Sequence, residues 1–454
     1  MFWRPPAATM PDPLPNEARA QHAFPPCYVP ARYITSDVPG IGGRLKERPE
    51  DFLVDEVPLY PPSGSGEHIY LTVQKRLLST YDMVSIIASH FGVRRKDIGY
   101  AGLKDKHAIT RQTLSIYAPG RKIEDFKTFA HPSLDIQGAT YHNNKLRPGH
   151  LRGNRFSIRI RGVEPTQVVH ASRVLKQLAA SGVPNRVGEQ RFGLLENNHV
   201  IGAALLRADW QGVCDELLGP CPSFPDINPE AREHYAAGRF SEALQAMPMR
   251  ARVESVVLNA LSKNYSAKGA VNVMDDTLMG FYLSAFQSAL FNVVLDHRIE
   301  EGTLGALLPG DVAVKHENFA AFSVDDQTAA DPSTARRLSS FEISPSGPMW
   351  GNSMKRATDE RDRIECEALA RAGLTPDDLD AARGRPQGLI DGKRRPLRVP
   401  LIDPDCEGGV DEHGPYVRLM FELPRGSFAT VVAREIMKPA NPKIAGPSDE
   451  PGES

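Results

Sequence analysis

The pattern of apolar and polar positions predicts strands near both ends of the chain and helices between them. Residues 69–73 alternate between apolar and polar side chains, as a half-buried strand does. Residues 80–91 then repeat apolar positions at helical spacing after Thr80, a residue type suited to cap a helix. Near the other end, residues 416–423 alternate like the first strand. The two ends therefore contain strands, and a helix follows the first of them.

Helical periodicity dominates the middle of the chain, from residue 182 to residue 398. Its most apolar helix falls in residues 280–299, where one stripe consists of Tyr282, Ala285, Phe286, Ala289, Leu290 and Val293. Such a stripe is typical of a helix packed in a core. Residues 303–350 interrupt the helices with Gly, Pro and short β-prone runs. This segment predicts a small irregular β element inside the helical block.

Strand-rich ends around a helical block predict an α+β protein. We expect a mixed, mainly antiparallel sheet domain flanked by helices and interrupted by an inserted, mainly helical domain. The expected division is a Pro-rich N-terminal extension at 1–39, the sheet domain at 40–181 and 399–438, the insertion at 182–398 and a disordered tail at 439–454. The segments at both ends lack apolar periodicity and are expected to carry no chemistry.

Composition limits the possible functions without choosing one. The 54 basic and 56 acidic residues nearly balance, so a polyanion must be held by a local basic surface. The cysteines are odd in number and scattered, which indicates neither a disulfide framework nor a zinc site; they are Cys27, Cys214, Cys221, Cys366 and Cys406. Prolines interrupt the first residues, and no run of about 18 apolar residues occurs. We expect a cytoplasmic protein without a membrane segment.

Two patterns imitate metal sites. Residues 403–414 space their acidic residues and Gly408 like a calcium loop, but the last place holds Gly414 instead of a bidentate Glu. The histidines lack the regular spacing and companion ligands of a metal site. No metal is expected.

Residues 141–159 form a candidate RNA-binding surface. This stretch has no acidic residue, and its cations are Lys145, Arg147, Arg152, Arg155 and Arg159. Residues 155–161 alternate, which predicts a strand with one apolar and one cationic face. Cationic runs are commonly just solvated faces, but Gly149, Gly153, Asn154 and Phe156 add close backbone approach, an amide and a ring for stacking. Together these features favour single-stranded or distorted RNA.

The stretch GYAGLKDKHAITRQ, residues 99–112, places Asp105 between Lys104 and Lys106. Neighbouring cations favour the ionised form of a carboxylate, and an ionised carboxylate is suited to nucleophilic attack rather than to general-acid work. A surface turn held by simple ion pairs accounts for the same tripeptide. The residues alone leave both interpretations open.

Seven stretches taken together resemble the TruD family of tRNA pseudouridine synthases in order and approximate spacing. They are LKERPEDFLVDE, GEHIYL, GYAGLKDKHAITRQ, KLRPGHLRGNRF, VPNRVGEQRFG, LSAFQSALFN and PRGSFATVVAREIM. The resemblance implies a pseudouridine synthase catalytic domain interrupted by a TRUD domain, tRNA as partner and no cofactor. It also implies isomerisation of a uridine, expected at position 13 of the tRNA D-arm, with Asp105 as the catalytic residue. A monomer is expected.

The resemblance assigns substrate contacts residue by residue. Phe52, Asn154 and Phe428 would hold the target nucleotide, with Lys46 and Phe156 in the surrounding pocket. The target base would be flipped out and stacked on an aromatic wall. Asp105 would attack C1′, as a retaining glycosidase carboxylate does, or C6 of the ring. The sequence does not choose between these routes.

Two departures and two alternatives remain. The family often carries aromatic residues where this chain has Arg186 and Val187, so the resemblance does not extend to a ring contact there. The inserted block is also long, with additional helices between residues 213 and 275. The alternatives are the same chemistry on another RNA and an RNA-binding or folding chaperone. The intact set of Asp105, Asn154 and Phe428 argues against loss of the isomerisation.

Overall fold

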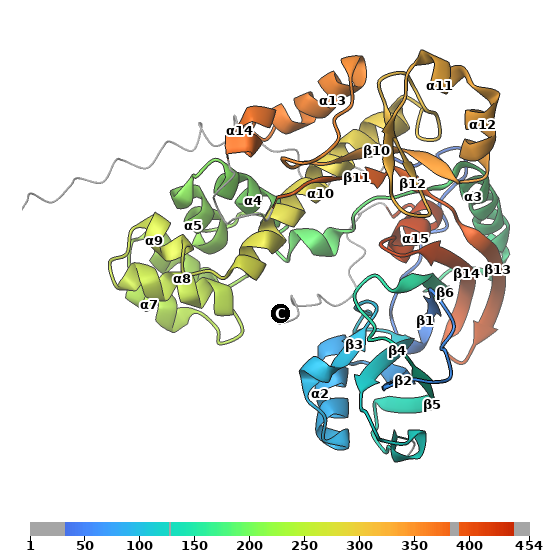
Figure 1. Cartoon of the computed structure of the whole chain (residues 1–454). Helices are drawn as coiled ribbons and strands as arrows, with labels where there is room; N and C mark the ends of the chain where they lie inside the picture. The colour runs from blue at the N-terminus through green and yellow to red at the C-terminus, as the bar shows by residue number, and fades with distance from the viewer. Residues whose placement is uncertain (1–31, 127–128, 382–389, 440–454) are drawn as a thin grey trace, which may run out of the picture.

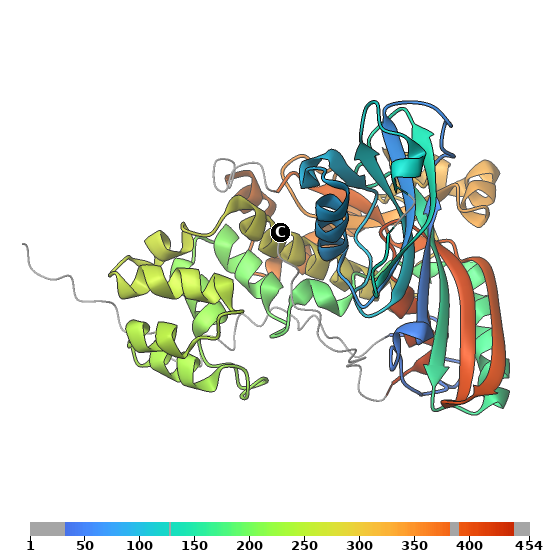
Figure 2. The ribbon, with the colours of Figure 1, turned by 90° about the horizontal axis from the view of Figure 1, so that it is seen from below.

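The computed structural model describes residues 32–126, 129–381 and 390–439. It is an α+β structure in which the inserted helices form a lobe beside a large sheet (Figures 1 and 2). This confirms the predicted fold class. The predicted N-terminal extension up to residue 31, including Cys27, and the predicted tail from residue 440 lie outside the described residues.

A large eight-stranded sheet forms the base of the molecule. Its strands are β1 (Phe52–Pro58), β2 (His68–Arg76), β3 (Ile98–Tyr100), β4 (Ile109–Tyr117), β5 (Leu134–His142), β6 (Leu151–Arg161), β13 (Ile402–Asp411) and β14 (Gly414–Pro424). The order is β13-β14-β6-β1-β4-β2-β5, and β3 pairs with β4. Within the described strands of this sheet, β1 and β4 are the one parallel pair. Because β14 pairs with β6, the last strands of the chain complete the sheet begun by the first.

Two groups of helices cover one face of this sheet at opposite ends. Helix α2 (Thr80–Phe91) packs on β2 and β4, whereas α3 (Val168–Ser181) and α15 (Ala429–Met437) pack on β6 and β14. The strand registers place both apolar clusters on the same face. The single turns η1 (Pro49–Asp51), η2 (Arg95–Asp97), η3 (Ile123–Phe126) and η4 (Pro165–Gln167) connect these elements. Between the two helix-covered ends, the loop from β3 to β4 packs on the central strands of that face.

Helix α2 begins one residue earlier than its predicted cap implies. The Ser79 hydroxyl accepts a hydrogen bond from the Asp82 backbone N–H, so Ser79 is the N-cap and Thr80 is the first helical residue. The Thr80 hydroxyl instead accepts from the backbone N–H of Lys104 at 3.0 Å. Both residue types can cap a helix, and the Thr80 side chain is taken by the loop that carries Asp105.

The inserted part combines helices with a second, smaller sheet. Its helices are η5 (Glu189–Phe192), α4 (Asn198–Leu206), α5 (Trp210–Leu218), α6 (Pro229–Ala236), α7 (Phe240–Ala246), α8 (Arg252–Ser262), α9 (Ala267–Val271), α10 (Asp276–Glu300), α11 (Asp326–Ala330), α12 (Pro332–Ser339), α13 (Asp359–Ala370) and α14 (Pro376–Ala381). The sheet has the order β11 (Lys393–Pro396), β10 (Ile343–Met349), β8 (Val312–Lys315), β9 (Ala321–Ser323). It confirms the β element predicted within residues 303–350.

Helix α10 is the central helix of the insertion. Its predicted stripe is buried from Tyr282 to Leu290, and Val293 is partly buried against the same core. Within the described residues, α10 is the one helix long and apolar enough to cross a membrane by length and composition. However, 67% of its most apolar window is buried inside the protein. Packing in the core of the insertion therefore explains why this helix is so apolar.

The two chain crossings between sheet domain and insertion pair with each other. Strand β7 (Val183–Pro184) and strand β12 (Arg398–Val399) form a two-stranded antiparallel ribbon. The apolar cores of the insertion and of the sheet domain are otherwise largely separate. On this basis we propose domain boundaries at residues 182 and 398.

Residues 32–39, expected to belong to the extension, pack on the sheet domain. Val38 is fully buried in its core. The buried Glu435 carboxylate on α15 accepts hydrogen bonds from the Ile34 and Thr35 backbone N–H groups and from the Thr35 hydroxyl at 2.7 Å. Burial raises the pKa of Glu435, and these donors offset part of that effect. These residues bind mainly through their backbone N–H groups, which every residue type except proline has. Their sequence therefore shows no apolar periodicity from which the contact could be predicted.

Candidate active site

Asp105 lies in the loop between β3 and β4. Its Oδ1 accepts a hydrogen bond from the His107 backbone N–H at 2.9 Å, and its Oδ2 forms an ion pair with Lys46. The fully buried Lys75 donates to the Asp105 carbonyl oxygen at 2.6 Å. The carboxylate retains 18% exposure. It is thus fixed on several sides while one side stays accessible.

Lys46 joins the carboxylate to an aromatic cluster. Its ammonium lies 4.8 Å from the centroid of the Phe52 ring, and the Phe52 and Phe156 rings meet edge to face with centroids 6.3 Å apart. Lys46 has a φ of 54°, a left-handed conformation that a residue with a side chain rarely adopts. Such backbone strain concentrates at functional sites. Four predicted site residues, Asp105, Lys46, Phe52 and Phe156, therefore come together.

Phe52 and Phe156 are mainly core residues in this structure. Phe52 is only 4% exposed, and Phe156 also packs against Phe421 at 5.6 Å between ring centroids. Together they form an apolar wall that Lys46 connects to Asp105, and little of the Phe52 ring is exposed.

Asn154 and other polar side chains lie side by side on a sheet face that is otherwise mostly apolar. In the registers, Gln112 on β4 and Asn154 on β6 lie on either side of β1, on the face that also carries Leu114 and Phe156. The Oδ1 of Asn154 and the Oε1 of Gln112 are buried and accept no hydrogen bond from the residues that the structure describes. An unsatisfied buried acceptor is costly and calls for a partner. These two acceptors therefore mark a polar cluster under the loop that carries Asp105.

Sequence reasoning missed Gln112 and its neighbour Thr110, whose hydroxyl oxygen is also buried without a partner in the described part of the chain. The alternation of residues along strand β4 could have indicated both positions. Thr110 and Gln112 occupy the strand positions that continue the buried face of Leu114 and Ile116. Polar residues at inward-facing strand positions are the exception that marks a site.

Lys104 does not contribute a cation to the surface around Asp105. Its ammonium forms an ion pair with Glu56 at 2.6 Å, and both side chains are at least 96% buried, with exposures of 4% and 3%. Glu56 also accepts a hydrogen bond from the Thr113 backbone N–H. Lys106, by contrast, is exposed. The Lys104–Glu56 pair thus fastens the loop of Asp105 to strand β1.

The cationic face predicted for residues 155–161 is only partly free. Arg161 is 2% exposed and is paired with Asp51 and Asp411, both at 2.6 Å. Its guanidinium lowers the pKa of Asp411 to about 2. Arg152 and Arg155 remain exposed, although each lies within 4 Å of Glu422, at 3.0 and 3.7 Å. The acidic partners come from distant parts of the chain, so the local stretch could not indicate them.

Phe428 lies at the junction of the sheet domain with the insertion. It caps α15, and it packs against the core that contains Phe52 and against the cluster of Val187 and Phe291. Arg395 of the insertion donates to the carbonyl oxygen of Gly426 at 2.9 Å, two residues before Phe428. Phe428 is therefore held from both domains.

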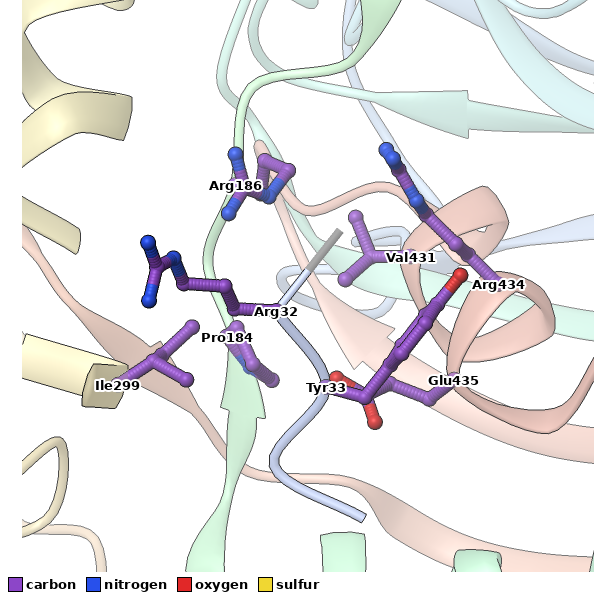
Figure 3. Close-up of a pocket in the computed structure, with 8 residues that line it drawn as sticks. All are labelled: Arg32, Tyr33, Pro184, Arg186, Ile299, Val431, Arg434 and Glu435. Carbon is purple, nitrogen blue, oxygen red and sulfur yellow. The ribbon is translucent and has the colours of Figure 1, made fainter. Parts of the chain in front are cut away.

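Arg186 and Val187, which replace the aromatic residues common in the family, have structural partners. Arg186 pairs with Asp296 on α10, and the backbone of Val187 exchanges two hydrogen bonds of 3.0 Å with the Asn292 side chain. Figure 3 shows Arg186 beside Arg32, Tyr33 and Arg434 around a small cavity at this junction. With a volume of about 10 Å³, the cavity has room for roughly one water and none for a nucleotide.

The described residues contain no group of three or more His, Cys, Asp or Glu side chains placed to hold a metal ion. Most of the segment that imitates a calcium loop, up to Asp411, lies in strand β13 and is paired with β14.

Comparison with known proteins identifies the family and supports the fold. A family model described as tRNA pseudouridine synthase D (TruD) matches residues 29–436. The tRNA pseudouridine synthase D of Geobacter metallireducens is 41% identical over 414 residues, which is 90% of this chain and 98% of that protein. That of Geotalea daltonii is 42% identical over 408 residues, covering 89% and 99%.

A solved structure shows the same arrangement. The crystal structure of a protein from Methanosarcina mazei, assigned as tRNA pseudouridine synthase D (TruD), superposes with a TM-score of 0.76 at 26% identity, over 89% of this chain and 95% of that one. The fold and these similarities define an RNA pseudouridine synthase, an isomerase. The chain belongs to the TruD family of tRNA pseudouridine synthases.

Proposed function

We propose that this protein converts a uridine of tRNA to pseudouridine, at position 13 of the D-arm, with Asp105 as the nucleophile and the target base flipped out of its stack. The observation that carries the proposal is the Asp105 carboxylate, held by the His107 N–H and by Lys46, whose ammonium also lies over the Phe52 ring. The family supports tRNA as the RNA.

Capture of the uracil is the first requirement. Flipping a base costs a few kcal/mol, and stacking returns about 1 to 3 kcal/mol per base. Uracil presents one N–H donor at N3, and the unpaired acceptors of Asn154 and Gln112 suit such a donor. Phe428 and the edge of Phe52 would border the nucleotide, and Phe156 supports the Phe52 ring.

Isomerisation then requires that the N1–C1′ bond break, that the bound base turn, and that a C5–C1′ bond form. The proton lost from C5 is balanced by a proton gained at N1. Asp105 would attack C1′ and hold the sugar during the turn, or attack C6 of the ring. Water must be kept from C1′, because hydrolysis there would leave an abasic site. The apolar wall of Phe52 and Phe156 serves this need. The proposed reaction needs no cofactor.

We also propose that the enzyme works as a cytoplasmic monomer. All four cysteines of the described residues are free thiols, which suits a reducing compartment.

The decisive experiment maps pseudouridine in total tRNA after incubation with the enzyme or with its Asp105→Asn variant, which keeps the side-chain shape. We expect a single new site in the D-arm with the native enzyme and none with the variant, while the Kd for tRNA stays within a few-fold. Pseudouridine formation by the Asp105→Asn variant would refute the assignment of Asp105 as the nucleophile. A site in another RNA, with none in tRNA, would refute the substrate.

A further inference from the structure

A phenylalanine of the insertion reaches the catalytic sheet from the hairpin between β8 and β9. Phe319 follows the hairpin turn with a φ of 59°, and 40% of its surface is exposed. Its backbone N–H donates to the Lys315 carbonyl oxygen at 2.9 Å, which fixes the turn. A single exposed apolar residue needs no explanation by itself. The position of this one, however, is specific.

The ring of Phe319 lies against a cation of the sheet domain. The Arg425 guanidinium is 5.3 Å from the ring centroid, and the same side chain donates a hydrogen bond to the Gly149 carbonyl oxygen. The Arg425 backbone N–H donates to the Arg152 carbonyl oxygen at 3.0 Å. No carboxylate among the described residues forms an ion pair with Arg425. Its positive charge is therefore oriented but not neutralised.

Backbone contacts connect this pair to the loop of Asp105. The N–H of Gly149 donates to the carbonyl oxygen of Ala101 at 2.8 Å, and Ala101 begins the loop that carries Asp105. Gly149 has a φ of 93°, and a Cβ there would lie 3.3 Å from the Arg425 guanidinium. The Phe319–Arg425 pair is thus linked through Gly149 to the loop that carries Asp105.

We propose that Phe319 and Arg425 form a stacking platform for an unpaired base of the RNA substrate next to the uridine that reacts. The ring would stack on the base, and the guanidinium would contact the phosphate of the same nucleotide. The inference rests on the proposed RNA substrate but not on the role of Asp105. It assigns to the inserted domain a direct contact with the RNA.

The first test places a fluorescent probe on the platform. A Phe319→Trp variant is made in the Asp105→Asn background, so that tRNA binds without turnover. The control is Met249→Trp in the same background, because Met249 is 96% exposed in the helical lobe. Saturating tRNA should quench the indole introduced at position 319 and leave the one at position 249 unchanged. Equal emission changes in both variants would overturn the proposal.

The second test separates stacking from a merely structural contact between domains. Phe319→Leu keeps an apolar side chain in the hairpin but removes the π-face, so Kd for tRNA should rise about tenfold with an unchanged salt slope. Arg425→Gln should raise Kd and also reduce the slope of log K against log salt by about 0.7 to 0.9. Thermal melts of both variants should match the native enzyme.

Two failures can be told apart. Native tRNA affinity in Phe319→Leu, together with Asp105-dependent turnover, would overturn the platform and leave the proposed function standing. Absence of both tRNA binding and tRNA modification by the native enzyme would overturn the proposed function and the platform with it.

Discussion

Asp105 is held by residues that are far from it in the sequence. Lys46 reaches its carboxylate from the segment before β1, and Lys75 of β2 binds its carbonyl oxygen. Because the ammonium of Lys46 also lies over the Phe52 ring, the same cation orients both the carboxylate and the wall beside it. The position of the Asp105 carboxylate therefore depends on Phe52, through Lys46.

We predict that Phe52→Leu lowers kcat/KM about tenfold, since the loss of the ring contacts corresponds to roughly 1.4 kcal/mol. The matched control is Phe421→Leu, because Phe421 is buried in the same core and contacts Phe156 but not Lys46. Both variants should lose a similar free energy of unfolding, roughly 1.5 kcal/mol or less. An equal loss of kcat/KM in both would show that Phe52 acts only through packing. Steady-state kinetics and urea unfolding supply the two measurements.

Helix α4 buries an imidazole in the inserted domain. His199 is 2% exposed against the Phe192 ring, and burial lowers its pKa to about 4. His316, beside β8, has its pKa lowered to about 4 by burial and by Arg398. Both groups bind a proton more readily in the unfolded chain, where an imidazole has a pKa of about 6.5. The free energy of unfolding that depends on these two neutral histidines is present in full above about pH 6.5. It is lost as the pH falls towards 4.

We predict that the free energy of unfolding decreases by several kcal/mol between about pH 7 and pH 4.5, as expected from two such histidines. A His199→Leu variant should lose roughly half of this pH dependence, while His90→Gln, at an exposed position, should keep it. Urea unfolding at the two pH values measures the difference. An unchanged pH dependence in His199→Leu would contradict the assignment.

At the scale of the whole molecule, the insertion and the sheet domain share the loop that carries Phe428. Arg395 donates hydrogen bonds to the Asn185 side chain at 2.6 Å and to the Gly426 carbonyl oxygen at 2.9 Å, and it lies over the Phe291 ring. The Arg395 guanidinium thus connects the segment after β7 with the loop before α15. The position of Phe428 is therefore coupled to the placement of the insertion.

We predict that Arg395→Met lowers kcat/KM about tenfold or more, because the lost hydrogen bonds of a charged donor each contribute about 1.5 to 3 kcal/mol. Arg363→Met on α13 is the control, since this exposed arginine pairs only with carboxylates of its own helix among the described residues. We expect a calorimetric scan to show one transition for the native enzyme and two for Arg395→Met. Native activity in this variant would mean that Phe428 is positioned by the sheet domain alone.

The main strands, the core helix of the insertion and the family of the protein could be predicted from the sequence alone. Alternation at residues 69–73 and 416–423, and the stripe of α10, depend on local periodicity, which the chain carries in full. The motif around Asp105 indicated the family because its residues are contiguous.

Which polar groups meet depends on the folding of distant segments onto one another. Arg161 was assigned to a cationic surface, but Asp51 and Asp411, 110 and 250 residues away, neutralise it in the interior. Thr80 binds the loop of Asp105 instead of capping its helix, and Gln112 with Asn154 forms a polar row across strands. Each of these depends on pairing between distant segments. Periodicity reports whether a position faces the core, whereas the partner that it finds there is set by sheet register and domain packing.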